Sequence, residues 1–113
     1  MINKKCFAID FDGTLVVDAY PDIGIPKLEI VNKVKQLILN GHEVILWTCR
    51  TGEYLQNAIT FCEDTLGIKF DRVNESSLNN LNKYHVDSRK IGADYYVDDK
   101  CISLNEFINL DLR

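Results

Sequence analysis

One stretch decides the fold of this chain, and it runs Lys5-Cys6-Phe7-Ala8-Ile9-Asp10-Phe11-Asp12-Gly13-Thr14-Leu15. Residues 6–9 form an apolar run with the length of a buried strand. The run stops at two acids, Asp10 and Asp12, which are followed by a Gly-Thr pair. Because side chains alternate along a strand, we expect both carboxylates to lean toward the same side. Like charges this close are unfavourable unless a cation, a proton or a reacting substrate compensates them.

The alternative for this stretch is a strand end followed by an ordinary Asp-Gly turn. A second doubled acid weighs against that alternative, because Asp98 and Asp99 follow another apolar run at residues 93–97. A solvated turn would also explain the second pair on its own. Two doubled acids at strand ends in one small chain favour a functional site over two unrelated turns.

The composition is that of an ordinary globular protein. The chain has 113 residues, of which 46% are hydrophobic and 27% charged, so we predict a single domain over residues 1–113. Its formal net charge of −4 argues against general nucleic-acid binding. We find no signal-peptide pattern and no run of membrane-spanning length. The cysteines contain no C-x-x-C pair, which favours a reducing, cytoplasmic setting; they are Cys6, Cys49, Cys62 and Cys101.

Four apolar runs have strand character, at residues 6–9, 43–48, 68–73 and 93–97. Helical spacing predicts one helix from Pro26 to Asn40-Gly41 and a second from an N-cap at Thr51 to Gly67. A last short helix is expected over residues 103–112, with its apolar residues inward: Leu104, Phe107, Ile108 and Leu112. Residues 16–26 suggest a hairpin or flap, and residues 79–88 a loop or frayed helix.

This alternation predicts an α/β fold, a parallel sheet with helices on both faces. Right-handed crossovers then bring the carboxyl ends of all strands to one edge. That edge collects Asp10, Asp12, Thr48, Asn74, Asp98 and Asp99.

Three or four carboxylates on one rim predict a hard divalent cation, and Mg²⁺ suits Asp98 with one acid of the first pair. An aspartate can also be a nucleophile that forms an acyl-phosphate, while a second acid two residues on moves protons. Thr48 and the backbone N–H groups beside it suit phosphate oxygens, unless Thr48 only starts a helix. Lys90, eight positions before Asp98, is a candidate to neutralise phosphate, although an exposed surface lysine is the usual alternative.

In order and position, these residues resemble the four motifs of the haloacid dehalogenase superfamily: Asp10 to Thr14, Thr48, Lys90 and Asp98-Asp99. The resemblance implies a three-layer Rossmann-like sheet and an Mg²⁺-dependent phosphatase. It implies that Asp10 is the nucleophile, Asp12 the general acid and base, and that Gly13, Thr48, Cys49 and Lys90 bind phosphate. It also implies Mg²⁺ ligation by Asp10, the backbone carbonyl of Asp12, and Asp98, with Asp99 as a further ligand or neighbour. Lys83 and Lys100 compete for the role of Lys90.

The superfamily usually covers its site with a cap domain, and no stretch here is long enough for one. Three segments resemble a small uncharacterised hydrolase subgroup of bacteria and phages: Tyr20 to Gly24, Trp47 to Arg50, and Ser88 to Lys90. An open site admits a small phosphorylated molecule or a macromolecular phosphate end, and a second copy of the chain is one candidate to cover it.

The sequence also allows three other functions to be compared with this one. A cysteine phosphatase built on Cys49 needs an arginine six positions on, where Leu55 stands. A phosphoacceptor signalling domain needs its lone aspartate at a middle strand that here ends in Thr48. A non-catalytic module that binds phosphate or metal remains an alternative, although all the expected catalytic groups are present.

Overall fold

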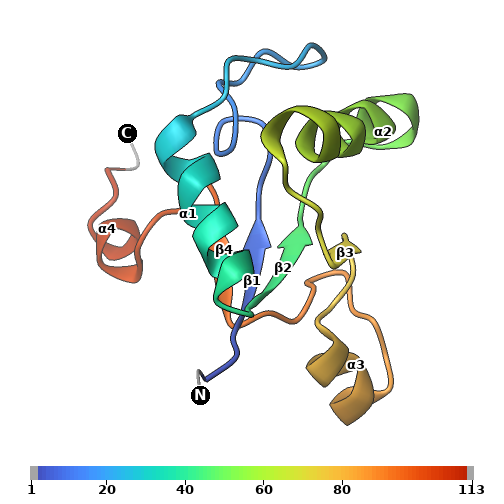
Figure 1. The fold of residues 1–113 in the computed structure, drawn as a ribbon. Helices are drawn as coiled ribbons and strands as arrows, with labels where there is room; N and C mark the ends of the chain where they lie inside the picture. The colour runs from blue at the N-terminus through green and yellow to red at the C-terminus, as the bar shows by residue number, and fades with distance from the viewer. Residues whose placement is uncertain (1–2, 112–113) are drawn as a thin grey trace.

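The computed structural model describes residues 3–111, and strands and helices alternate along it (Figure 1). The strands are β1 (Cys6–Ile9), β2 (Glu43–Leu46), β3 (Arg72–Val73) and β4 (Tyr95–Val97). The helices are α1 (Leu28–Leu39), α2 (Gly52–Phe61), α3 (Leu78–Tyr84) and α4 (Leu104–Ile108). A π-helical turn, η1 (Cys62–Leu66), continues α2. The alternation confirms the predicted α/β class.

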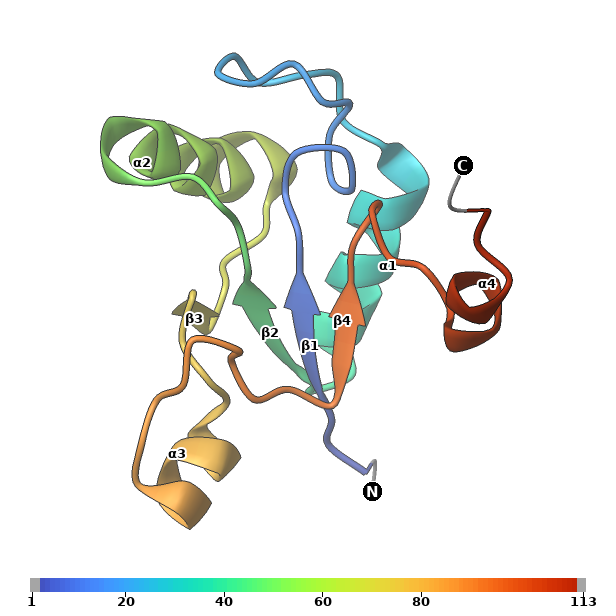
Figure 2. The same ribbon diagram turned by 180° about the vertical axis from the view of Figure 1, so that it is seen from behind.

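The strands form one parallel sheet in the order β3-β2-β1-β4. β1 is central, and its last residue, Ile9, pairs with Leu46 of β2 and Val97 of β4. The three strands therefore end at the same level, at the upper edge of the sheet in Figures 1 and 2. The residues that follow Ile9, Leu46 and Val97 therefore lie together at this edge of the sheet.

The main core lies between one face of the sheet and the helices α1 and α2. Ile9 of β1 and Val44 of β2 pack there with Val34 of α1 and Ala58 of α2, all of them buried. The predicted apolar stripes of both helices contribute to this cluster. Burying these side chains is the main stabilising term for the domain, at about 1.5–3 kcal/mol for each large one.

The opposite face is covered more thinly. Its buried cluster joins Cys6, Ala8 and Ile45 to Ile91, which lies in the segment between α3 and β4. In the views of Figures 1 and 2, α3 lies below the sheet, near the amino ends of the strands. The second layer is thus built largely from the chain that returns to β4.

Some elements differ from the sequence predictions. The first helix begins at Leu28, after an N-cap at Lys27, rather than at Pro26. The third strand, predicted over residues 68–73, is limited to β3, although Ile68 is fully buried. In the polar stretch 79–88, for which a loop or frayed helix was predicted, the first residues belong to the short helix α3.

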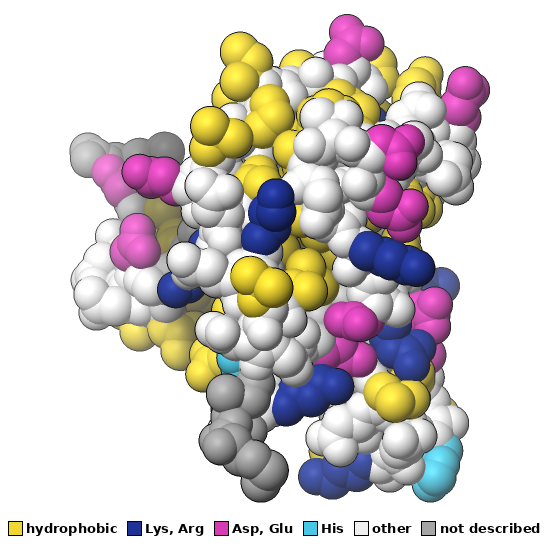
Figure 3. All heavy atoms as spheres, viewed as in Figure 1, with side chains coloured by type: hydrophobic (Ala, Val, Ile, Leu, Met, Phe, Trp, Pro, Cys, Tyr) yellow, Lys and Arg dark blue, Asp and Glu magenta, His cyan; other side chains and the backbone are white. Residues whose placement is uncertain are grey.

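The inward face predicted for the last helix is wrong. Leu104, Phe107 and Ile108 of α4 are 83%, 63% and 78% exposed, because α4 lies at the side of the molecule, where Figure 3 shows hydrophobic side chains at the surface. Leu112 lies outside the described residues. In the described part of the chain, no helix has the length and apolarity to cross a membrane.

Candidate active site at the carboxyl edge of the sheet

A cavity of about 420 Å³ opens where the three strands end. Its walls come from the segments that follow β1, β2 and β4 and from the predicted flap, residues 16–26. The lining residues are Asp10, Asp12, Asp18, Tyr20, Thr48, Cys49, Arg50, Asp98, Asp99 and Lys100. The sheet therefore brings together most of the predicted site residues, as parallel strands ending at one level require.

Three carboxylates converge on this cavity. Oxygen atoms of Asp10, Asp98 and Asp99 all lie within 4.8 Å of one another. Asp10 is fixed from both sides: its N–H donates to the Val97 carbonyl at 2.9 Å, and its Oδ2 accepts from the Thr14 hydroxyl at 3.1 Å. Thr14 Oγ1 in turn accepts the N–H of Asp99 at 3.0 Å, so this buried threonine ties the first acid motif to the second.

Burial and crowding make one of these carboxyls bind its proton more tightly than usual. Desolvation, followed by the negative charge of Asp98, raises the pKa of Asp10 from 3.8 to about 6. Both causes have the expected sign, because burial and a neighbouring anion disfavour the charged form of an acid. A cation bound among the three oxygens would reverse this shift, since the same cluster would then face a positive charge.

Gly13 lets Asp99 approach the loop. It has φ +90°, and a Cβ added there would overlap the Asp99 carboxylate. Its N–H donates to the Val16 carbonyl at 2.8 Å, closing the turn after β1. Gly13 was expected to bind phosphate, but this N–H is already used inside the loop, so the glycine is required by the close approach of Asp99.

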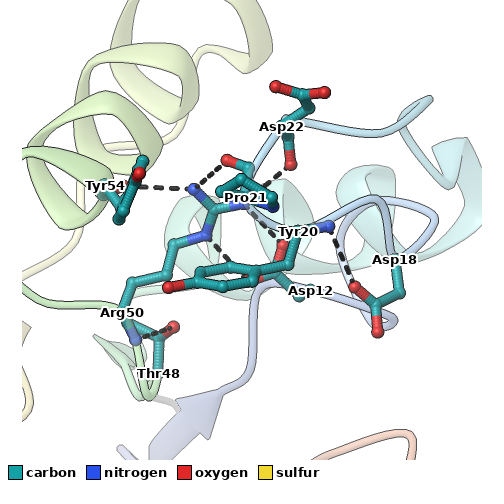
Figure 4. A network of polar contacts seen from close by, with 8 residues as sticks. All are labelled: Asp12, Asp18, Tyr20, Pro21, Asp22, Thr48, Arg50 and Tyr54. Atoms are coloured by element: carbon teal, nitrogen blue, oxygen red, sulfur yellow. Dashed lines mark hydrogen bonds and ion pairs between the residues drawn. The ribbon is translucent and has the colours of Figure 1, made fainter.

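Asp12 occupies a different environment from Asp10. The Arg50 guanidinium binds both of its oxygens, with Nε 2.7 Å from Oδ2 and Nη2 2.7 Å from Oδ1 (Figure 4). The Asp12 carboxylate is not part of the three-acid cluster. Both oxygens are directed to Arg50 and neither belongs to the cluster, so the geometry places the Asp12 side chain apart from the candidate metal ligands. Its backbone carbonyl was the atom that the sequence resemblance implied.

Arg50 is buried, with 1% of its surface exposed, and its remaining donors bind backbone carbonyls. Nη1 donates to Pro21 and Tyr54, each at 3.2 Å, and Nη2 donates to Asp22 at 2.9 Å. All five N–H groups of a guanidinium can thus be assigned. The hydrogen bonds to Asp12 raise the pKa of Arg50 above its usual value. One side chain joins the acid motif, the flap and the start of α2.

Thr48 and Asn74 form the second wall. Thr48 N–H donates to Asn74 Oδ1 at 2.8 Å, and Asn74 Nδ2 donates to the Thr48 carbonyl at 3.0 Å. Thr48 Oγ1 accepts the N–H of Arg50 at 3.1 Å, which leaves its own O–H proton to donate into the cavity. The backbone N–H of Thr48 is therefore occupied, and its hydroxyl is the group that suits a phosphate oxygen. Cys49 lines the cavity beside it, with an exposed thiol.

The lysine of the site differs from the one predicted. Lys90 does not line the cavity; its Nζ lies 5.9 Å above the Tyr96 ring, on the thinly covered face. Lys90 belongs to the segment between α3 and β4, which packs through Ile91 on that face of the sheet. Lys100, two residues after Asp98, lines the cavity instead. Lys27 reaches the same loop, where its Nζ donates to the Gly13 carbonyl at 2.6 Å.

The role of Arg50 was not predicted from the sequence. The residue appeared only at the end of the segment Trp47 to Arg50, and its partner Asp12 is 38 positions away. The available signal was its place two residues after Thr48, which predicts that it returns to the same edge. Thr14 was likewise quoted within the motif without a role.

Comparison with known proteins gives a match among solved structures. No protein-family model matches the chain, and no curated protein matches it. Among solved structures, the conserved protein coded by a locus from Bacteroides thetaiotaomicron matches with a TM-score of 0.76 and 36% sequence identity. The match covers 88% of this chain and 79% of that chain.

Proposed function

The chain belongs to the same family as this conserved Bacteroides protein, and from its own site we propose that it is an Mg²⁺-dependent phosphohydrolase of the haloacid dehalogenase type. Asp10 is the nucleophile and Asp12 the general acid and base. The substrate is a phosphate monoester, either a small molecule or the phosphorylated end of a larger one.

The observation that carries the proposal is the carboxylate cluster of Asp10, Asp98 and Asp99 in the cavity at the carboxyl edge. The Thr14 hydroxyl donates to Asp10 and the Lys100 N–H donates to Asp98 at 3.0 Å, but these bonds use only part of the cluster's oxygens, and the crowded carboxylates still repel one another without a cation. Here the pKa of Asp10 is raised to about 6. Perturbed acids that line a cavity are typical of catalytic sites.

The donor set fits Mg²⁺. This ion prefers a few carboxylate oxygens together with water and substrate phosphate, and three carboxylates within 4.8 Å of one another supply the protein part. Asp10, Asp98 and Asp99 would hold the ion, which would offset their mutual repulsion and the charge that develops on the phosphoryl group.

The proposed reaction has two steps. An Asp10 oxygen forms a bond to phosphorus while the bond to the leaving oxygen breaks, and Asp12 gives that oxygen a proton. A water molecule, deprotonated by Asp12, then attacks phosphorus, and the bond to Asp10 breaks to release inorganic phosphate. The Thr48 hydroxyl and Lys100 line the cavity and suit the phosphate oxygens.

Arg50 is consistent with the role of Asp12. It fixes the direction of the Asp12 carboxylate by two bonds of 2.7 Å. Each carboxylate oxygen has a second lone pair, so Asp12 can still exchange a proton with a leaving group while Arg50 holds it. Asp12 gives a proton to the leaving oxygen in the first step and takes one from water in the second, so each turnover returns it to its starting state.

Release of phenolate from an aryl phosphate tests the proposal. Wild-type protein with Mg²⁺ should turn over, and chelation of the metal should stop it. Asp10→Asn keeps the size of the side chain and removes its charge, so turnover should fall by about a thousandfold or more. If Asp10→Asn keeps more than about a tenth of wild-type turnover, Asp10 is not the nucleophile.

Asp12→Asn separates the two steps. An activated aryl phosphate needs little protonation of its leaving oxygen, so the aspartyl-phosphate should form and then persist. The expected record is a burst of phenolate followed by slow turnover. Equal losses in both steps would assign Asp12 a structural role. Wild-type protein that binds Mg²⁺ and phosphate without turnover would favour a non-catalytic binding module.

We also propose that the protein works in a reducing, cytoplasmic compartment. Cys6 and Cys62 are buried free thiols, and burial raises the pKa of Cys62 to about 12. Unpaired thiols of this kind suit a reducing, cytoplasmic setting.

A further inference from the structure

We propose that Tyr20 is a stacking platform that selects phosphate esters whose leaving group carries a planar ring. This inference rests on the proposed phosphohydrolase function and names the class of substrate for that site. Three features of the cavity carry it: the exposure of Tyr20, the rigid support beneath its ring, and its position on the side of Asp12.

Tyr20 presents an exposed aromatic ring to the cavity. Its side chain lines the cavity and is 55% exposed, whereas the neighbouring aromatic residue of the acid motif, Phe11, is fully buried. Apart from Tyr20, the cavity is lined almost entirely by charged and polar side chains. A large aromatic ring that faces such a cavity offers the apolar surface that a ligand's ring would cover.

The ring is held from behind. The Arg50 guanidinium carbon lies 5.1 Å from the ring centroid of Tyr20 and 5.1 Å from that of Phe11. Tyr54 contacts Tyr20 edge to face, with centroids 5.8 Å apart. Because hydrogen bonds to Asp12 and three carbonyls immobilise Arg50, Tyr20 has a fixed support (Figure 4). A surface fixed before binding loses little entropy when a ligand stacks on it.

Tyr20 lies on the side from which a leaving group departs. In the proposed reaction, Asp12 protonates the leaving oxygen, so the rest of the leaving group extends from Asp12. The same guanidinium that binds Asp12 supports the Tyr20 ring, whereas Asp98 and Asp99 follow β4 on the metal-binding side. A ring one or two bonds from the leaving oxygen would therefore meet Tyr20.

Charge restricts the class further. Asp18 lines the same rim, and its Oδ1 accepts the N–H of Tyr20 at 3.2 Å. Additional phosphates on the leaving group would approach this carboxylate, which disfavours nucleic-acid strands and polyphosphates. The surface suits a monoester with one phosphate and a neutral planar ring.

Benzyl phosphate and cyclohexylmethyl phosphate form a matched pair for the test. Both release a primary alcohol, and their rings have similar size, but only one ring is planar. Wild-type protein with Mg²⁺ should prefer benzyl phosphate by about fivefold in kcat/KM, the scale of an aromatic contact. Tyr20→Phe should keep the preference and Tyr20→Leu should lose it. Tyr84→Leu removes an exposed tyrosine of α3 and should change neither rate.

Binding of the non-hydrolysable benzylphosphonate and cyclohexylmethylphosphonate, each with Mg²⁺, separates this inference from the proposed function. Tighter binding of benzylphosphonate by wild type but not by Tyr20→Leu supports the platform, even if neither ester is hydrolysed and the phosphohydrolase proposal fails. Equal affinities in wild type overturn the platform, whatever the turnover. A preference that survives in Tyr20→Leu overturns it as well.

Discussion

Acidic side chains lie at both ends of the parallel sheet, and the two ends use them differently. At the amino ends of the strands, Asp94 Oδ2 accepts the N–H of Cys6 at 2.7 Å and Asp71 Oδ2 accepts the N–H of Val44 at 2.8 Å. These acids extend the hydrogen bonding of the sheet past its last paired residues. At the carboxyl ends, Asp10, Asp98 and Asp99 crowd together around a cavity.

This difference separates acids that stabilise the folded state from acids that destabilise it. A carboxylate that accepts backbone N–H groups lowers the free energy of the folded state. Crowded carboxylates raise it until a cation or a proton compensates them. Asp12 belongs to the carboxyl edge by position, but with Arg50 it is paired like an acid of the amino edge. The following predictions test this division.

The largest effect on stability is expected for Arg50→Met. It leaves Asp12 without its partner and removes the donors to three carbonyls, so the free energy of unfolding should fall by about 3–5 kcal/mol, as for other broken buried ion pairs. Denaturant unfolding measures the change. Arg72→Met is the control, because Arg72 is 22% exposed, its contact with Glu43 is long at 3.7 Å, and its other partner Glu75 is exposed, so these pairs should contribute less than about 1 kcal/mol. Similar losses in both variants would mean that Asp12 is not held as the geometry indicates.

Asp94→Ala should come next. It removes the acceptor of the Cys6 N–H and should lower the free energy of unfolding by about 1–3 kcal/mol. Turnover of an aryl phosphate per folded molecule should stay near wild type, because Asp94 is at the opposite end of the sheet from the cavity. A protein of unchanged stability would contradict the structural role of the amino-edge acids.

Asp98→Ala, at the carboxyl edge, should change the free energy of unfolding in the opposite direction. Without Mg²⁺, this variant should be as stable as wild type or more so, because one charge of the cluster is gone. The Mg²⁺ concentration for half-maximal turnover should rise by about tenfold or more, which corresponds to about 1.4 kcal/mol of metal binding. An unchanged Mg²⁺ requirement would assign the ligand role to Asp99 instead.

The smallest effect is the pH dependence of metal-free protein. The pKa of Asp10 is about 6 in the folded state against 3.8 ordinarily, so the folded state holds the proton more tightly. Its contribution to stability is therefore complete below about pH 4 and is lost as pH rises toward 6. Thermal unfolding from pH 4 to 7 should show this slope in wild type, and Asp10→Asn should reduce it. Mg²⁺ should raise the Tm more at pH 7 than at pH 5, because protons compete for Asp10.

The sequence predicted the sheet, and the edge where the acids gather, because both depend on local patterns. An apolar run followed by Asp10, or by Asp98, specifies a buried strand and what lies at its end. Chain direction then fixes the edge. Lys90 comes before β4 and not after it, so this rule gave no reason to place Lys90 at the carboxyl edge.

What could not be predicted depends on partners distant in sequence. The spacing of Leu104, Phe107 and Ile108 correctly indicates one apolar helical face, but spacing cannot show whether another element covers it. The pairing of Arg50 with Asp12 joins residues 38 positions apart, and no local pattern encodes it. The occupied N–H of Gly13 is a property of the closed turn, which a motif does not reveal.

The cavity is bounded by a flap of about ten residues, and the described residues 3–111 place no domain above it. Enzymes that enclose their substrates are often limited by the opening of a lid, a motion that a viscous solvent slows. Here the proposed nucleophile, Asp10, follows the central strand, and Pro21 and Asp22 of the flap are hydrogen-bonded to Arg50 without a ligand. Addition of a viscogen such as sucrose should consequently leave kcat unchanged, and substrates should exchange with solvent faster than they react.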